Sequence, residues 1–395
     1  MMTAFDPTNV VLDFCDLDDL LTPAEREIRY TLRQFVEAEV TPFITPYWEN
    51  GQDVRPFLYK LRALNICGAG LKGYGIPAFS WVGAGLISME LARGDVSLAT
   101  LFGATSSLCM TSIALCGSEA QKQHWLPKLA RLDCTGTFAL TEPNFGSDAA
   151  HIQTSAQREG DGYVLNGEKR WIGGGTFADV MVVWAREVET GQVCGFLVEK
   201  DMPGFAATAI EHKLALRAIP NADIKFTDCR IPLANKLENA HSFKDTARVL
   251  RETRLMVAWI AAGVAQAAYE LALGYAKQRV QFGRPIAGFQ LVQQKLVHML
   301  QELELMKLMT WRLAKLQDAG KLTDAQAALA KLNNAAKMRQ CVALAREVMG
   351  GNGILIDRHA ARFFADAEAI YSYEGTHEIN TLVVGREITG LRAFV

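Results

Sequence analysis

One carboxylate near the end of the chain has the surroundings of a catalytic base. Glu374 lies between an aromatic residue, Tyr373, and the step Gly375-Thr376, after a long helical region and the glycine-rich turn Gly350–Gly353. Such a turn can hold a carboxylate rigidly and partly away from water, and desolvation raises a carboxylate pKa toward neutrality. A glutamate beside a glycine is more often a solvated turn, so the hypothesis of a base depends on three other segments.

The first of these segments is Phe138–Asp148, which reads FALTEPNFGSD. Pro143 and Gly146 predict a tight loop. On this loop Thr141 and Ser147 can direct hydroxyl and backbone N–H groups at a planar, hydrogen-bonding ligand. A polar loop that only joins two domains is an equally good interpretation of the segment by itself.

The second segment is Gly167–Gly175, which reads GEKRWIGGG. The pair Asn166-Gly167 predicts a hairpin turn. Trp171 precedes three consecutive glycines, which allow the backbone to approach a ligand closely. Considered alone, the segment is better interpreted as a core tryptophan beside a loose turn.

The third segment, Tyr275–Ile286, predicts a helix that stops at Gly283 and restarts after Pro285. Arg279 can bind a pyrophosphate through two parallel hydrogen bonds. The alternative is a solvated arginine in the last turn of a helix, where a positive charge interacts favourably with the helix dipole.

Together with the Glu374 segment, these segments resemble the acyl-CoA dehydrogenase family, including its acyl-CoA oxidase branch. The resemblance covers nearly the whole chain and is closest to the branch of glutaryl-CoA dehydrogenases and short-chain acyl-CoA oxidases. It implies an FAD enzyme in which Glu374 removes the α-proton of an acyl-CoA and the product is a trans-2-enoyl-CoA. The motifs that carry the likeness are Leu140–Pro143, Tyr373–Thr376 and Gly385–Gly390.

The resemblance also implies contacts, residue by residue. The residues that would contact FAD are Phe138, Leu140, Thr141, Ser147, Trp171, Gly173, Arg279, Phe282, Gln290, Glu347, Gly350, Gly351, Thr376 and Glu378. Those that would contact the acyl-CoA are Ser147, Arg254, Tyr373 and Gly375. Six of the FAD contacts would reach the FAD of a neighbouring subunit, namely Arg279, Phe282, Gln290, Glu347, Gly350 and Gly351. The resemblance therefore implies a homo-oligomer, commonly a tetramer built as a dimer of dimers.

Three positions depart from the family pattern. Gly173 stands where many relatives have a threonine whose hydroxyl points at flavin N5, and its absence bears on reactivity with oxygen. Glutaryl-CoA dehydrogenases carry an arginine for the distal carboxylate near the stretch Glu90–Arg93, and the matching position here is Ala99. We therefore expect a short, uncharged acyl chain. Glu347 replaces the glutamine of several relatives.

Helix and strand signals indicate the elements that position these residues. Capping boxes predict helix starts at Thr22, Ser118 and Thr323. From about Thr141 to Leu237, closely spaced turn signals and β-prone runs predict a small β-barrel or sandwich. The long periodic segments after Ser242 predict an antiparallel helical bundle.

The expected fold is therefore mainly α with a central β-domain, arranged as in the acyl-CoA dehydrogenases. We expect an N-terminal helical domain over residues 1–137, a middle β-barrel over 138–241 and a C-terminal four-helix bundle over 242–395.

Composition excludes several other classes. The chain has 395 residues and a formal charge of −2, with no basic run, so a nucleic-acid surface is not expected. Eight scattered cysteines without a Cys-x-x-Cys pair predict buried thiols, and seven histidines without ligand spacing predict no metal site. The most apolar helix candidate, Leu255–Ala265, is too short to span a membrane.

The termini complete these expectations. Met1–Asp6 lacks the pattern of a secretory signal, and the end Arg392–Val395 is not a peroxisomal address, so a cytoplasmic enzyme of fatty acid β-oxidation is expected. Its electron acceptor would be an electron-transfer flavoprotein. Two alternatives remain: an acyl-CoA oxidase that passes electrons to oxygen, and a non-catalytic flavoprotein subunit with the same fold.

Overall fold

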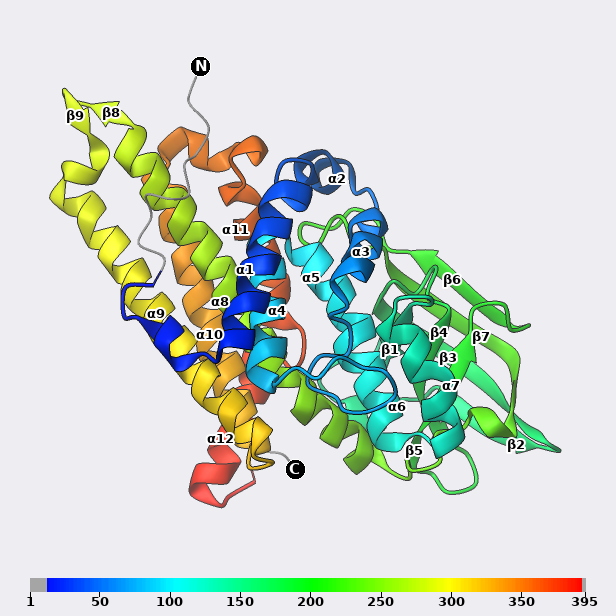
Figure 1. Cartoon of the computed structure of the whole chain (residues 1–395). Coiled ribbons are helices and arrows are strands. Elements are labelled where there is room, and N and C mark those ends of the chain that lie inside the picture. Colours follow the sequence, from blue (N-terminus) through cyan, green and yellow to red (C-terminus); the bar gives the residue numbers. More distant parts are fainter. Residues whose placement is uncertain (1–12, 393–395) are drawn as a thin grey trace.

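A computed structural model describes residues 13–392. The chain forms two groups of helices, with the strands of a single curled sheet between them in the sequence, so the predicted fold is confirmed. In space the sheet lies at one side of the molecule (Figure 1). Residues 1–12 and 393–395 lie outside the described part. They include Met1–Asp6 and most of the Arg392–Val395 segment, on which the targeting predictions depend.

The N-terminal region is helical, as predicted. The capping boxes at Thr22 and Ser118 both form, each with its reciprocal pair of hydrogen bonds, and they start α1 and α7. The helices of this region are α1 (Pro23–Phe35), α2 (Ile44–Asn50), α3 (Arg55–Lys60), α4 (Trp81–Gly94), α5 (Val96–Gly103), α6 (Met110–Cys116) and α7 (Glu119–Ala130), with short 3₁₀ or π segments between several of them.

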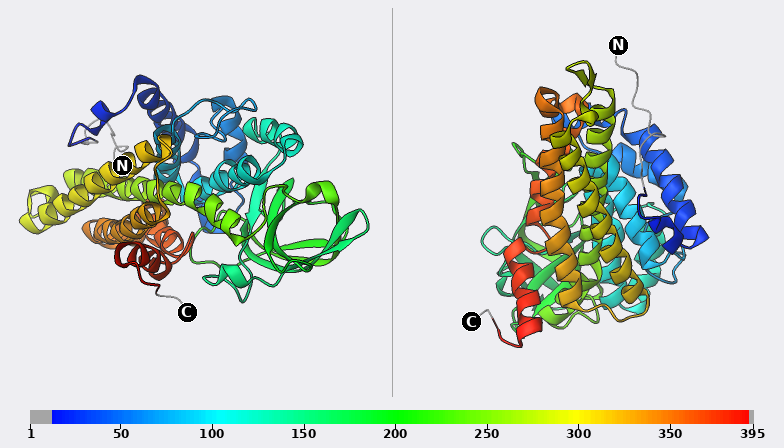
Figure 2. Two further views of the ribbon diagram at one scale, coloured as in Figure 1. Left: turned by 90° about the horizontal axis from the view of Figure 1, so that it is seen from below. Right: turned by 90° about the vertical axis from the view of Figure 1, so that its left-hand side faces the viewer.

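The middle of the chain forms one seven-stranded sheet. In its main path the strand order is β1-β4-β2-β3-β7-β6, and β5 pairs with β4. The strands curl round to enclose a core of their own (Figure 2, left). They are β1 (Gly136–Ala139), β2 (Ser155–Glu159), β3 (Gly162–Gly173), β4 (Val180–Glu187), β5 (Val193–Glu199), β6 (Phe205–Ala209) and β7 (Asn221–Pro232).

The predicted hairpin turn at Asn166-Gly167 is wrong. Both residues lie inside β3, where the pairing with β7 shifts register between Leu165 and Gly167. The side chain of Asn166 accepts a hydrogen bond from the backbone N–H of Asp228 at 2.8 Å. The pair therefore marks a β-bulge, which glycine favours for the same conformational reason that it favours a turn.

The C-terminal region is the expected helical bundle. The third capping box forms at Thr323 and starts α10. The elements of the bundle are α8 (Phe243–Gln278), β8 (Val280–Gln281), β9 (Arg284–Pro285), α9 (Gln290–Asp318), α10 (Asp324–Val348), α11 (Ala360–Ser372) and α12 (His377–Thr389).

The predicted end of the first bundle helix is also wrong. The helix α8 ends at Gln278, and the chain then forms the two-residue strands β8 and β9. Phe282 and Gly283 make the turn between these strands with positive φ angles of 51° and 78°. Arg279 therefore caps α8 and does not lie in its last turn.

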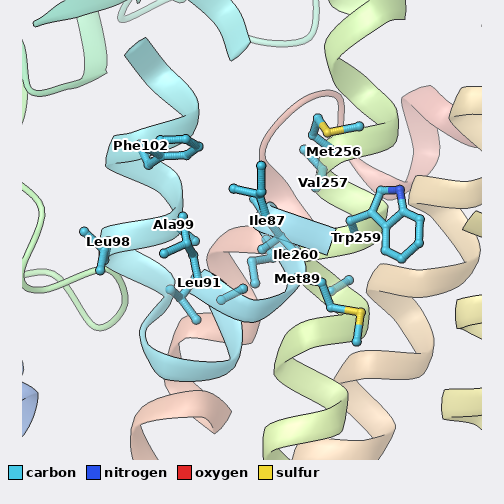
Figure 3. Packing of buried hydrophobic residues seen from close by; sticks show 14 of the residues in the cluster. Ile87, Met89, Leu91, Leu98, Ala99, Phe102, Met256, Val257, Trp259 and Ile260 are labelled. Atoms are coloured by element: carbon cyan, nitrogen blue, oxygen red, sulfur yellow. The ribbon is translucent and has the colours of Figure 1, made fainter. Parts of the chain in front are cut away.

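Helices α4 and α8 cross very closely in the main core (Figure 3). A Cβ atom on Gly85 would lie 2.1 Å from Nε1 of Trp259, and one on Gly263 would lie 2.1 Å from the carbonyl oxygen of Met89. The two glycines therefore allow the helices to pack without a gap. Ala99 of α5 lies in the same buried cluster.

Within residues 13–392, two helical stretches are long and apolar enough to cross a membrane by length and composition alone. They are Val96–Cys116 and Phe243–Gln278, and 67% and 94% of their most apolar windows are buried inside the molecule. The prediction that the helix around Leu255–Ala265 is too short to span a membrane is therefore wrong, because this helix has 36 residues; its burial is that of a core helix.

The chemistry of the cysteines agrees with the prediction. Each of the eight is a free thiol, and all are buried except Cys15, which is exposed, and Cys134, which is partly buried. Between residues 13 and 392, no group of three or more histidine, cysteine, aspartate or glutamate side chains is arranged to hold a metal ion.

Candidate active site

Glu374 lies on a strained turn between two helices. α11 ends at Ser372 and α12 begins at His377, and the residues between them include Glu374 with φ 55° and Gly375 with φ 85°. A positive φ is disfavoured for a residue with a side chain, so the surrounding structure must hold Glu374 in place. The turn thereby directs the carboxylate back toward α8.

The carboxylate of Glu374 has the environment of a base. Burial raises its pKa, while the nearby charge of Arg254, a hydrogen bond from Thr253 and the charge of Lys331 act in the opposite direction. The hydroxyl of Thr253 donates to Oε1 at 2.8 Å. A carboxylate with a raised pKa is a stronger base, which suits it to proton abstraction.

Lys331 of α10 supports the same turn and was not predicted from the sequence. Its side chain is fully buried, and Nζ donates to the carbonyl oxygens of Tyr371 at 2.9 Å and Gly375 at 2.7 Å. Burial lowers the pKa of this ammonium to about 8, and the Glu374 carboxylate opposes that shift.

Four other predicted site residues lie around Glu374: Arg254, Tyr373, Thr376 and Glu378. Arg254 forms an ion pair with Asp324 at 2.6 Å, while its Nε is buried and has no hydrogen-bond partner. Burial raises the pKa of the Tyr373 phenol, which lies beside the hydroxyl of Thr100 on α5. Thr376 caps α12, and Glu378 is exposed in the first turn of that helix.

The loop after β1 is held by a buried ion pair. Nζ of Lys169 on β3 lies 2.8 Å from Oε1 of Glu142 and donates to the carbonyl oxygen of Leu140 at 3.0 Å. Glu142 also accepts hydrogen bonds from the backbone N–H groups of Gln153 and Thr154. Lys169 on one side of the predicted binding loop and the backbone of Gln153 and Thr154 on the other therefore hold the loop in one conformation.

The predicted ligand-binding residues on this loop differ in exposure. Phe138 and Thr141 are partly buried, Ser147 is exposed and Leu140 is buried. The carbonyl oxygen of Thr141 accepts a hydrogen bond from the backbone N–H of Arg170 at 2.8 Å, which brings the loop beside Trp171.

Trp171 is not a core residue. Its side chain is 52% exposed, and its φ of 65° is unusual for a bulky side chain. The guanidinium of Arg170 lies over the indole ring, 5.1 Å from its centroid. Gly173 follows at the end of β3, where its carbonyl oxygen accepts a hydrogen bond from the hydroxyl of Thr137 at 2.6 Å. The interpretation as a core tryptophan is therefore wrong.

Helix α5 connects the Trp171 segment with the Glu374 turn. Thr100 lies beside Tyr373, and the next residue, Leu101, lies 3.1 Å from the position of a Cβ atom on Gly174. Segments separated by about half the chain thus flank one helix. The spacing of the motifs in the sequence could not predict this arrangement.

A second group of predicted residues lies at the far end of the bundle. The hairpin of β8 and β9 is at the upper left in Figure 1, whereas α12 is at the lower end. Along α8, the path from Arg254 to Arg279 is about 38 Å at about 1.5 Å per residue. The residues of this distal group are Arg279, Phe282, Gln290, Glu347, Gly350 and Gly351, all of them exposed.

One chain therefore does not bring all the predicted cofactor contacts together. Phe282 projects from its turn with 93% of its surface exposed, and Glu347 forms an ion pair with Lys295 at 2.6 Å.

Several of the predicted contacts fit the flavin that the resemblance implies. The exposed indole of Trp171 offers a flat face for a planar ring, and the accessible hydroxyl groups of Thr141 and Ser147 offer hydrogen bonds. The buried, unpartnered Nε of Arg254 provides a further unused donor on the side of Glu374.

Comparison with known proteins gives a consistent result along the chain. Residues 22–133 match the N-terminal domain of acyl-CoA dehydrogenase, residues 137–229 match the middle domain and residues 243–389 match the C-terminal domain. The short-chain specific acyl-CoA dehydrogenase of rat mitochondria is 35% identical over 376 residues, which cover 92% of this chain and 90% of the rat protein.

Solved structures of similar proteins match nearly the whole chain as well. A glutaryl-CoA dehydrogenase from Mycobacterium smegmatis is 40% identical with a TM-score of 0.93, covering 96% of this chain and 98% of the other. A second structure of a glutaryl-CoA dehydrogenase from this organism, in complex with FADH2, is 36% identical with a TM-score of 0.94, covering 97% and 99% of the two chains.

Proposed function

The chain belongs to the acyl-CoA dehydrogenase family, and from this membership we propose that it oxidises a short-chain acyl-CoA to the trans-2-enoyl-CoA. It is an enzyme, and its cofactor is FAD. The observation that carries the proposal is the carboxylate of Glu374, which is held on a strained turn and receives a hydrogen bond from Thr253.

Glu374 is the proposed base for the α-proton. The thioester carbonyl acidifies that proton, and the backbone N–H of Glu374 is proposed to donate to the thioester oxygen as negative charge develops on it. Bound FAD supplies the acceptor for the β-hydrogen, which leaves as hydride. Thr253 orients the carboxylate, and burial increases its basicity.

The residues near Glu374 are proposed to hold the reactive part of the flavin and the acyl-CoA. The flavin contacts are Phe138, Leu140, Thr141, Ser147, Trp171, Gly173, Thr376 and Glu378, and the acyl-CoA contacts are Ser147, Arg254, Tyr373 and Gly375. The distal group from Arg279 to Gly351 is proposed to contact FAD bound by another subunit. Its distance from Glu374 along α8 supports a homo-oligomer, and we propose a tetramer.

The proposed substrate is an unbranched, uncharged acyl-CoA such as butyryl-CoA. Ala99, at the position matched to the arginine that reads a distal carboxylate, is buried in an apolar cluster. Arg93 does not offer an alternative, because its guanidinium is paired with Glu90, Glu270 and Glu37. Burial of an unpaired carboxylate is costly, so glutaryl-CoA is expected to be a poor substrate.

An electron-transfer flavoprotein is the proposed acceptor, and the cytoplasm the proposed location, for a role in β-oxidation. A specific observation favours the second candidate, an acyl-CoA oxidase, because Gly173 cannot provide a side-chain hydroxyl near the flavin.

Two replacements test this position. Comparing Gly173→Thr with Gly173→Ala separates the effect of the hydroxyl group from the effect of the added carbon atom. Either would place a Cβ atom 3.1 Å from Cδ1 of Ile219, a side-chain end that can move.

Reoxidation of the reduced, product-bound enzyme by air tests the acceptor. The dehydrogenase proposal predicts that this reaction is much slower than turnover with an electron-transfer flavoprotein. Reoxidation at the rate of turnover, with one hydrogen peroxide formed per product, identifies an oxidase. In that case Gly173→Thr should slow the oxygen reaction while Gly173→Ala should not.

A further inference from the structure

The two ends of the Glu374 turn are joined by a single buried ammonium group. Lys331 reaches from α10 and donates to the carbonyl of Tyr371, in the last turn of α11, and to the carbonyl of Gly375, directly before α12. The last carbonyls of a helix have no partner within that helix, so such a donor satisfies a group that is otherwise unpaired. Lys331 therefore bridges the residues on both sides of Glu374.

The turn has further anchors. The rings of Tyr371 on α11 and His377 on α12 stack across it, with their centroids 5.0 Å apart. Nδ2 of Asn380 lies 2.8 Å from the carbonyl oxygen of Gly375 and 3.0 Å from that of Thr376. Both of these bonds lie on the α12 side of Glu374. Unlike the bonds of Asn380, the two hydrogen bonds of Lys331 span the turn, as the ring stack does, and they hold backbone carbonyls on both its α11 side and its α12 side.

Lys331 also adds a positive charge beside the carboxylate. The charged groups that face it are Glu374 on the turn, Arg254 on α8 and Glu378 on α12. The positive charges that face Glu374 are those of Arg254 and Lys331. Arg254 is already paired with Asp324, whereas both hydrogen bonds of Lys331 go to neutral carbonyls. The charge of Lys331 therefore acts on Glu374 without a carboxylate partner in direct contact.

We propose that Lys331 is a positioning residue for proton abstraction. It joins the two sides of the turn that carries Glu374, and it favours the carboxylate form of that base. The inference rests on the proposed role of Glu374. The ammonium does not contact the substrate; it acts through the geometry of the turn and through its charge. Loss of the ammonium thus has two separable effects, one on the rate and one on its pH dependence.

The test uses the FAD-containing enzyme with three replacements on α10. Lys331→Met removes the charge and both hydrogen bonds but keeps the length of the side chain. Lys331→Gln removes the charge and keeps an N–H donor. Lys337→Met is the matched control, because Lys337 is paired with Glu302 at 3.0 Å and donates no hydrogen bond to the turn. The measurement is the rate of flavin reduction by saturating butyryl-CoA without oxygen, as a function of pH.

Both Lys331 variants are expected to retain FAD and acyl-CoA binding. Removing a nearby positive charge raises the pKa of Glu374, so the acidic limb of the rate profile should move to higher pH in both. Lys331→Met should also lower the maximal rate by about 10²-fold, the effect typical of a slight misplacement of a reacting group. Lys331→Gln should lose less of this rate, and Lys337→Met should match the wild type.

Several results would overturn the proposal. One is a wild-type profile in Lys331→Met, and another is a uniform loss of rate with an unmoved acidic limb, which would indicate structural support alone. A loss of FAD from both Lys331 variants but not from Lys337→Met would also reject it. Glu374→Gln in the same assay separates this inference from its premise: normal flavin reduction there rejects the proposed base itself, whatever Lys331 does.

Discussion

At the scale of single residues, the basicity of Glu374 results from burial opposed by three neighbours. Burial raises the pKa of the carboxylate, while Arg254, Thr253 and Lys331 favour its charged form. The sequence motif predicted the partly desolvated carboxylate, because a turn between two helices excludes water from one side. It did not predict Thr253 or Lys331, since both reach Glu374 from distant helices.

Thr253 offers a residue-scale prediction about pH. Thr253→Val keeps the shape of the side chain and removes the hydrogen bond to Oε1 of Glu374. Because that bond favours the carboxylate form, its loss should raise the pKa of Glu374 and move the acidic limb of flavin reduction to higher pH. The rate well above that limb should also fall, because Thr253 orients the carboxylate. The pH dependence of flavin reduction measures both effects, and an unmoved limb would show that the hydroxyl does not tune the base.

A signal for one of the two missed residues was nevertheless present in the sequence. Lys331 stands in an otherwise apolar stretch that includes Leu329 and Ala330, where a lysine is unusual and indicates a buried, paired charge. Thr253 stands next to Arg254, but nothing in the local pattern distinguishes it from a structural threonine. The long-range contact could be recognised only in the folded structure.

At the scale of elements, the loop after β1 depends on the buried pair Glu142–Lys169. The sequence predicted a tight ligand-binding loop from Pro143 and Gly146. The pairing that holds the loop joins two segments whose β-strand register was not predictable. For the same reason Asn166-Gly167 was interpreted as a turn: a bulge and a turn require the same residue types, and strand pairing decides between them.

Lys169→Met tests the importance of this pair. The replacement leaves Glu142 buried without its cation, and breaking a buried pair in this way typically destabilises a protein by about 3–5 kcal/mol. We expect lower thermal stability and weaker FAD retention, because the loop carries Thr141 and Ser147. The double replacement Lys169→Met with Glu142→Gln should recover part of the loss. A single variant with wild-type stability and FAD content would contradict this account of the loop.

At the scale of the whole molecule, the predicted cofactor contacts form two groups at opposite ends of the bundle. The pattern of helices predicted the bundle correctly but placed the end of α8 at Gly283. A glycine is the same signal at the end of a helix and in the turn of a short hairpin, and here it lies in the turn between β8 and β9. Only the structure shows that Arg279 and Phe282 belong to an exposed hairpin about 38 Å along α8 from Arg254. This separation supports an assembled enzyme.

Arg279→Ala tests the link between cofactor and assembly. If Arg279 contacts FAD bound by another subunit, its loss should weaken FAD retention and the oligomer together, since a ligand that binds the assembled state stabilises it. Size-exclusion chromatography with flavin absorbance measures both properties in one experiment. Arg284→Ala, a change in the same hairpin, serves as the control. A monomer of the Arg279 variant that keeps its FAD would contradict the proposal.

The most direct test of the central claim is anaerobic titration of the FAD-containing enzyme with butyryl-CoA, in the wild type and in Glu374→Gln. The wild type should lose its flavin absorbance as enoyl-CoA forms. Glu374→Gln should bind the acyl-CoA but reduce its flavin at least ~10³-fold more slowly, within the range for a positioned proton-transfer group. Near-normal reduction in the variant, or no reduction of the wild type by any short acyl-CoA, would contradict the account.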